Sequence, residues 1–171
     1  KGNPGLVREH WINSLRRPGE SRDSGMVSLY HTRQSAAGEG TAAFIDIPGD
    51  GGLTALCTDN RDMAELVLET MIRGRGTPFD RDMPVVDARI TRDGDIRKNP
   101  SWTVRSGGRE IVSTWRVAEP PVIMYGPAPS GIERIEIFSV LYFTNEASIT
   151  VDGRAVSGEP YTRAIWRSSI G

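Results

Sequence analysis

The sequence has 171 residues, of which 37% are hydrophobic and 25% are charged. This composition is typical of a soluble globular chain, long enough to bury a core without disulfides or metals. Its 21 basic and 22 acidic residues nearly cancel, so no overall field favours a polyanion and we expect no nucleic-acid partner. The 19 glycines and 11 prolines predict many turns and a β-dominated fold.

The supply of metal-ligating and reactive side chains is small. One cysteine and two histidines leave no internal disulfide and no thiolate-rich metal site, so we expect neither a metal nor another cofactor. A single cysteine is consistent with a reducing cytoplasm. The sequence begins at Lys1 and not at a methionine, so a signal peptide that has been removed is an alternative. No apolar run approaches the ~20 residues of a membrane span, so we expect no membrane partner.

Residues 1–25 are expected to form an N-terminal arm. Val7, Trp11 and Leu15 recur at intervals of four, which predicts a short helix, and Pro18 with Gly19 ends the pattern. The following residues 26–171 are expected to form a single barrel-like domain.

The next elements predicted are strands and one helix. Alternation and turn residues predict strands over 26–32, 41–47 and 53–57. Apolar residues at intervals of three and four then predict the main helix at about 59–73, with Asn60 among its N-capping candidates.

More strands are expected after the helix. They are placed over 84–91, 102–105, 110–117 and 122–125.

The stretch 132–167 carries the longest strand signal of the chain. Its sequence is apolar on both faces from Phe138 to Phe143, so both faces there should be covered. Asp152-Gly153 predicts a hairpin with a type I′ turn, because that turn needs positive φ at both central residues.

These elements predict an α+β, β-dominated fold. About nine or ten short strands, joined by turns and accompanied by one main helix, favour a curved and mostly antiparallel sheet that closes into a barrel-like domain. A parallel sheet would need a crossover helix after almost every strand.

Three residues are candidates for acid–base or nucleophilic chemistry. His31 ends the first of these predicted strands, where it would act as a general base at a barrel mouth or remain a surface histidine. Cys57 precedes the helix, whose amino end would lower a thiol pKa, although cysteine is more often simply buried. Asp87 shares a predicted strand face with Arg89, and the two would form the polar end of a pocket or be solvated.

The candidates for ligand binding are mostly large apolar side chains. Tryptophans at strand positions are expected to anchor the core or to wall a cavity. The candidates are Arg89, Trp102, Trp115, Met124, Tyr125, Phe138 and Tyr142.

The function expected from these features is the binding of a small organic molecule in a mainly apolar pocket. A first alternative is a cofactor-independent enzyme that uses acid–base chemistry on a small hydrophobic or carboxylated substrate. A second alternative is a homo-oligomeric interaction module, such as a homodimer, with Phe138, Val140 and Tyr142 at the interface.

Overall fold

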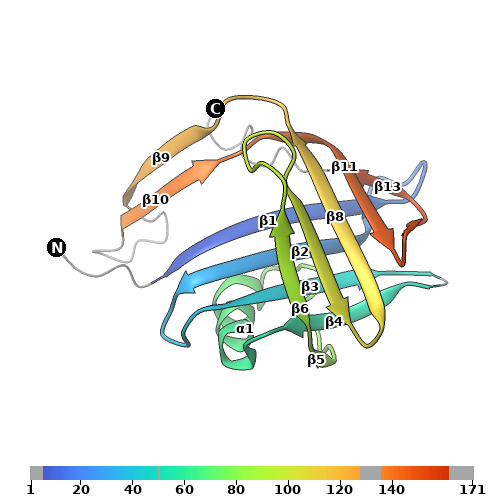
Figure 1. The fold of residues 1–171 in the computed structure, drawn as a ribbon, viewed down its shortest axis with the longest axis horizontal. Coiled ribbons are helices and arrows are strands. Elements are labelled where there is room, and N and C mark those ends of the chain that lie inside the picture. Colours follow the sequence, from blue (N-terminus) through green and yellow to red (C-terminus); the bar gives the residue numbers. More distant parts are fainter. Residues whose placement is uncertain (1–5, 50, 128–135, 162–171) are drawn as a thin grey trace.

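A computed structural model describes residues 6–49, 51–127 and 136–161, except for the side chains of 127 and 136–139. Its strands form three sheets (Figure 1). The largest has six strands, in the order β13 (Glu159–Tyr161), β1 (Val7–Arg16), β2 (Asp23–Gln34), β3 (Gly40–Ile47), β4 (Leu53–Thr58) and β5 (Val85–Asp87). The second has five, in the order β12 (Arg154–Ala155), β11 (Thr144–Val151), β8 (Arg109–Val117), β7 (Ser101–Ser106) and β6 (Arg89–Asp93). The third is the pair of β9 (Val122–Pro127) and β10 (Glu136–Leu141).

The six-stranded sheet is buried on both faces. One face packs on the five-stranded sheet through a cluster that includes Val27, Ile45 and Ile111, and the residues alternating with these, such as Phe44, face the helix. Successive side chains of a strand point to opposite faces, so this double burial explains why residues 42–45 are apolar without interruption.

The predicted helix is present as two joined pieces. α1 (Arg61–Val67) continues directly into the π-helical turn η1 (Leu68–Ile72). The Asn60 side chain accepts a hydrogen bond from the Met63 amide, as expected of an N-cap. Met63, Ala64 and Val67 are buried against β3 and β4.

The predicted hairpin at Asp152-Gly153 is confirmed. Both residues have positive φ, 52° and 75°, and Val151 lies opposite Arg154. The fold is therefore β-dominated with one main helix, as the sequence predicts.

The short helix predicted in residues 1–25 is wrong, because the structure has β1 there. β1 pairs with β2 along its whole length and is an inner strand of the six-stranded sheet. An interval of four residues does not distinguish the two structures, since it keeps Trp11 and Leu15 on one side of a helix and also on one face of a strand. Ile12, which is partly buried and packs toward the opposite face, fits the strand.

The predicted closure into a barrel is not confirmed, because no sheet formed by the described residues closes on itself. The predicted strand over 84–91 divides instead at Ala88. β5 pairs in parallel with β4 in one sheet, and β6 pairs with β7 in the other. The Ala88 amide donates to the Thr58 carbonyl, so the chain passes between the sheets at this edge without joining them into one ladder.

Candidate functional site

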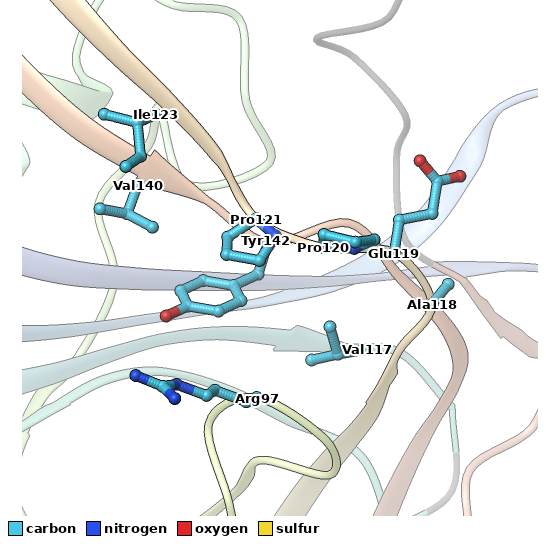
Figure 2. Close-up of a pocket in the computed structure, with 9 residues that line it drawn as sticks. All are labelled: Arg97, Val117, Ala118, Glu119, Pro120, Pro121, Ile123, Val140 and Tyr142. Atoms are coloured by element: carbon cyan, nitrogen blue, oxygen red, sulfur yellow. The ribbon is translucent and has the colours of Figure 1, made fainter.

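A depression of about 640 Å³ lies between the β9–β10 pair and the end of β8 (Figure 2). Its lining is mostly apolar and comes from three separate parts of the chain. The lining residues are Arg97, Val117, Ala118, Glu119, Pro120, Pro121, Ile123, Val140 and Tyr142.

The two prolines explain why a depression forms here. A proline has no backbone N–H and has a fixed φ, so Pro120-Pro121 stops the ladder that β8 makes in the five-stranded sheet. The chain then continues as β9, which pairs with β10 alone among the described strands. Ile123 lies opposite Val140 in this pair, so both side chains leave the same face and line the depression.

The loop between β6 and β7 supplies the cation of the lining. The Asp95 carboxylate accepts a hydrogen bond from the Arg97 amide at 2.9 Å, and the Lys98 carbonyl accepts one from the Val117 amide at 2.7 Å. The first bond lies within the loop, and the second holds the loop against the end of β8. No carboxylate in the described part of the chain pairs with the Arg97 guanidinium.

The polar groups lie at different ends of the depression. Figure 2 shows the Arg97 guanidinium and the Tyr142 hydroxyl pointing toward the same end, with the Glu119 carboxylate at the other. Apolar side chains separate them. A molecule with an apolar body and an anionic group therefore fits this lining, with its anion beside Arg97.

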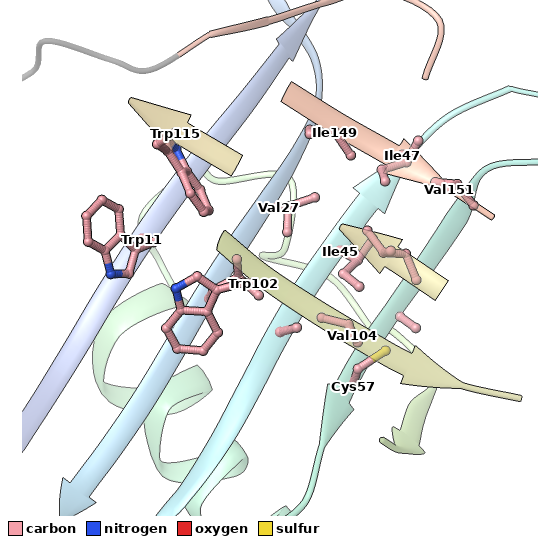
Figure 3. Close-up of a cluster of buried hydrophobic side chains, with 14 residues drawn as sticks. Trp11, Val27, Ile45, Ile47, Cys57, Trp102, Val104, Trp115, Ile149 and Val151 are labelled. Atoms are coloured by element: carbon pink, nitrogen blue, oxygen red, sulfur yellow. The ribbon is translucent and has the colours of Figure 1, made fainter. Parts of the chain in front are cut away.

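The depression rests on aromatic side chains of the core. Tyr142 stacks on Trp11 with ring centroids 6.0 Å apart, and Trp11 contacts Trp115 at 5.4 Å. Trp115 also donates from Nε1 to the Ile12 carbonyl at 3.0 Å. In Figure 3, Trp11, Trp102 and Trp115 lie together at one end of the buried cluster. Only Tyr142 among the described members of this stack also lines the depression.

Trp11, a member of this stack, also contacts an ion pair between Glu9 and Arg92. Trp11 donates from Nε1 to Glu9 at 2.6 Å, and the other Glu9 oxygen forms an ion pair with Arg92. His31 lies opposite Glu9 in the β1–β2 register, and its Nε2 is 3.8 Å from the Glu39 carboxylate. Both Glu9 oxygens thus have partners, and the pair links the two larger sheets.

The structure does not bring the three catalytic candidates together. Cys57 lies on β4 and His31 on β2, with β3 between them. Asp87 is 85% exposed and pairs with Arg61 at 2.9 Å near the start of α1. His31, Cys57 and Asp87 all lie outside the lining of the depression.

Cys57 is fully buried, and this burial raises the pKa of its thiol to about 11. The thiolate is the reactive form, so we expect native protein at neutral pH to be inert toward a thiol-reactive aromatic disulfide. Absorbance of the released thiolate should appear only after urea unfolds the chain. Rapid reaction of the native protein would contradict this assignment.

The ligand-binding candidates are placed in three surroundings. Trp102 and Trp115 are buried in the core and do not line the depression, while Arg89 is exposed opposite Arg105. Met124 and Tyr125 lie on β9, and Tyr142 lines the depression. Phe138 lies on β10, and its side chain is outside the described set.

Sequence reasoning missed the rest of the lining. The signal for Pro120 and Pro121 was visible as an interrupted ladder, but no pattern within one segment joins Arg97 to Ile123. These residues meet only because the β6–β7 loop packs beside the end of β8.

The chain was also compared with known proteins. No protein-family model, curated protein or solved structure matches it. Its described residues contain no group of three or more histidine, cysteine or carboxylate side chains placed to hold a metal ion. None of its described helices has the length and apolarity to cross a membrane.

Proposed function

We propose that this protein binds a small organic molecule with an apolar body and an acidic group, in the depression between β9–β10 and β8. The observation that carries this proposal is an apolar lining with the Arg97 guanidinium at one end, which forms no ion pair with a carboxylate of the described residues. Its volume of about 640 Å³ is within the range of small-molecule sites.

Binding is favoured over acid–base catalysis by the placement of the candidate residues. The general-base, nucleophile and carboxylate candidates lie elsewhere on the molecule, as described above. The lining supplies apolar area, the Arg97 cation and the Tyr142 hydroxyl to hold and orient a ligand, and the Glu119 carboxylate at the opposite end disfavours an anion there.

The test uses anilinonaphthalene sulfonate, an aromatic anion whose fluorescence rises in apolar surroundings. Arg97→Ala is expected to weaken its binding about fivefold, since an exposed charge-assisted bond contributes about 1 kcal/mol. Arg75→Ala removes an exposed arginine from the turn after η1 and is the matched control.

The apolar lining is tested separately. Ile123→Asp puts a carboxylate where the probe's ring should lie, and we expect at least a tenfold loss of affinity. Val85→Asp makes the same change at an exposed valine on β5 and should leave binding unchanged. Unchanged affinity in both Arg97→Ala and Ile123→Asp would refute the proposal. Native mass spectrometry of freshly purified protein would then identify any molecule that co-purifies.

A further inference from the structure

The loop between β6 and β7, which carries Arg97, is fixed by several short-range hydrogen bonds. Most of them involve Asp95. Its backbone carbonyl accepts from the amides of Lys98 and Asn99 at 2.9 and 2.8 Å, and its side chain accepts from the Arg97 amide at 2.9 Å. Its own amide donates to the Asn99 side chain at 3.4 Å. Asp95 therefore bonds to each residue from 97 to 99.

Packing and a glycine fix the rest of this loop. Ile96 packs against the buried cluster between the two larger sheets, and the Pro100 carbonyl accepts a hydrogen bond from the Trp115 amide at 3.1 Å. Gly94 has a φ of 77°, and a Cβ at this position would lie 2.2 Å from the Asn99 carbonyl oxygen. Real Cβ atoms do not approach that closely, so the loop adopts this shape only with glycine at position 94.

We propose that Asp95 and Gly94 are positioning residues of the ligand site, a role that rests on the proposed function. They hold the backbone of Arg97 beside the depression before a ligand binds. Ordering a loop on binding costs free energy, and a loop that is already ordered avoids this cost. The consequence is selectivity for an anionic molecule over a neutral one of the same shape. Neither residue lines the depression, so each acts through Arg97.

Two probes separate an effect on Arg97 from a general effect on the depression. Anilinonaphthalene sulfonate carries an anion, and N-phenyl-1-naphthylamine has the same rings without it. Asp95→Ala removes the acceptor of the Arg97 amide and is expected to weaken binding of the sulfonate about threefold, a large part of the effect of Arg97→Ala. Binding of the neutral probe should stay unchanged. Equal losses for both probes would show that Asp95 maintains the depression as a whole and does not position Arg97.

Asp95→Asn separates the hydrogen bond from the charge. Asparagine keeps a carbonyl oxygen that accepts from the Arg97 amide, but it is neutral. The ion pair of Asp95 with Lys98 is exposed, with a separation of 3.8 Å, and contributes little. The affinity of this variant for the sulfonate should therefore be no lower than that of wild type. Losses of equal size in Asp95→Asn and Asp95→Ala would show that the bond to the Arg97 amide is not what matters.

Gly94→Ala tests the shape of the loop. The added methyl group would meet the Asn99 carbonyl, so the loop must open and Arg97 must move. Binding of the sulfonate should weaken about as much as in Arg97→Ala, again without loss of the neutral probe. Gly108→Ala is the matched control, because Gly108 also has a φ of 77° but nothing lies within 4 Å of a Cβ there. It carries the same backbone strain and should bind both probes as wild type does. Thermal melting verifies that each variant is folded.

Hydrogen exchange at the Arg97 amide measures positioning without a ligand. This amide should exchange about fivefold faster in Asp95→Ala than in wild type, and at the wild-type rate in Asp95→Asn. Equal rates in wild type and Asp95→Ala would overturn the positioning role and leave the proposed ligand site standing. Unchanged probe binding in Arg97→Ala would instead refute the ligand site, and the positioning role would fall with it.

A double variant completes the test. If Asp95 acts through Arg97, then Asp95→Ala with Arg97→Ala should bind the sulfonate no more weakly than Arg97→Ala alone, because no guanidinium is left to position. Losses that multiply would show that Asp95 affects the depression by another route, and the inference would be wrong.

Discussion

Acidification from pH 6.5 to about pH 3 is expected to lower the free energy of unfolding by on the order of 3 kcal/mol through His10 alone. Burial beside β2, and secondarily the charge of Arg8, lower the pKa of His10 from 6.5 to about 3. Its Nε2 lies 2.8 Å from the Ser28 hydroxyl, and its ring stacks on Tyr30 with centroids 4.0 Å apart.

The sign follows from which state binds the proton. Between pH 3 and 6.5 the unfolded chain protonates this histidine and the folded chain does not, so acid favours unfolding. The stabilising contribution is complete above pH 6.5 and is lost as the pH falls toward the folded pKa. The full shift would correspond to roughly 4.8 kcal/mol, and the partial exposure of the ring reduces the expected effect.

Urea unfolding at a series of pH values measures this effect. His10→Phe keeps an aromatic ring for Tyr30 but cannot titrate, so its stability should fall less steeply with acid than that of wild type. Protonation of carboxylates also destabilises in acid, and subtraction of the two curves removes that common part. Equal slopes for wild type and His10→Phe would show that His10 is not the titrating group.

The surroundings of His10 could not be predicted from the sequence. Assigning residues 1–25 to a helical arm left His10 without neighbours, whereas the β1–β2 register places it opposite Tyr30. The turn at Asp152-Gly153 and the cap at Asn60 were predictable, because a few adjacent residues determine each of them. Pairing between distant strands has no such local signal.

The depression was predictable only in part. Two-sided apolarity from Phe138 to Phe143 indicated a segment that needs cover on both faces, and Tyr142 lies there. Val140 remains 41% exposed, so the described chain covers this segment incompletely. That residual exposure is the physical reason for seeking a ligand on its face. The contribution of Arg97 depends on how two sheets pack, which one-dimensional patterns do not contain.

Trp115→Ala is expected to lower the free energy of unfolding by about 3–5 kcal/mol, the range for removing a buried indole. The side chain is 2% exposed and lies between the two larger sheets. Its removal opens a cavity beside Trp11, and the Ile12 carbonyl loses its bond to Trp115. Chemical denaturation monitored by circular dichroism measures the loss.

A second variant separates packing from hydrogen bonding. Trp115→Phe keeps an aromatic ring against Trp11 but has no N–H for Ile12, so we expect a loss of about 1–3 kcal/mol. A similarly small loss in Trp115→Ala would mean that neighbouring side chains collapse into the space, and the proposed anchoring role would be wrong.

Trp115→Ala should also change ligand binding in the depression. Tyr142 stacks on Trp11, and Trp11 in turn packs on Trp115, so the lining is supported from within the core. Trp115→Ala should therefore weaken binding of the anionic probe under conditions where the variant is still folded, although Trp115 does not line the depression. Thr103→Ala changes a buried residue of β7 outside this stack and should leave probe binding unchanged. Equal binding by wild type and folded Trp115→Ala would show that β9 and β10 hold the lining without support from the tryptophans.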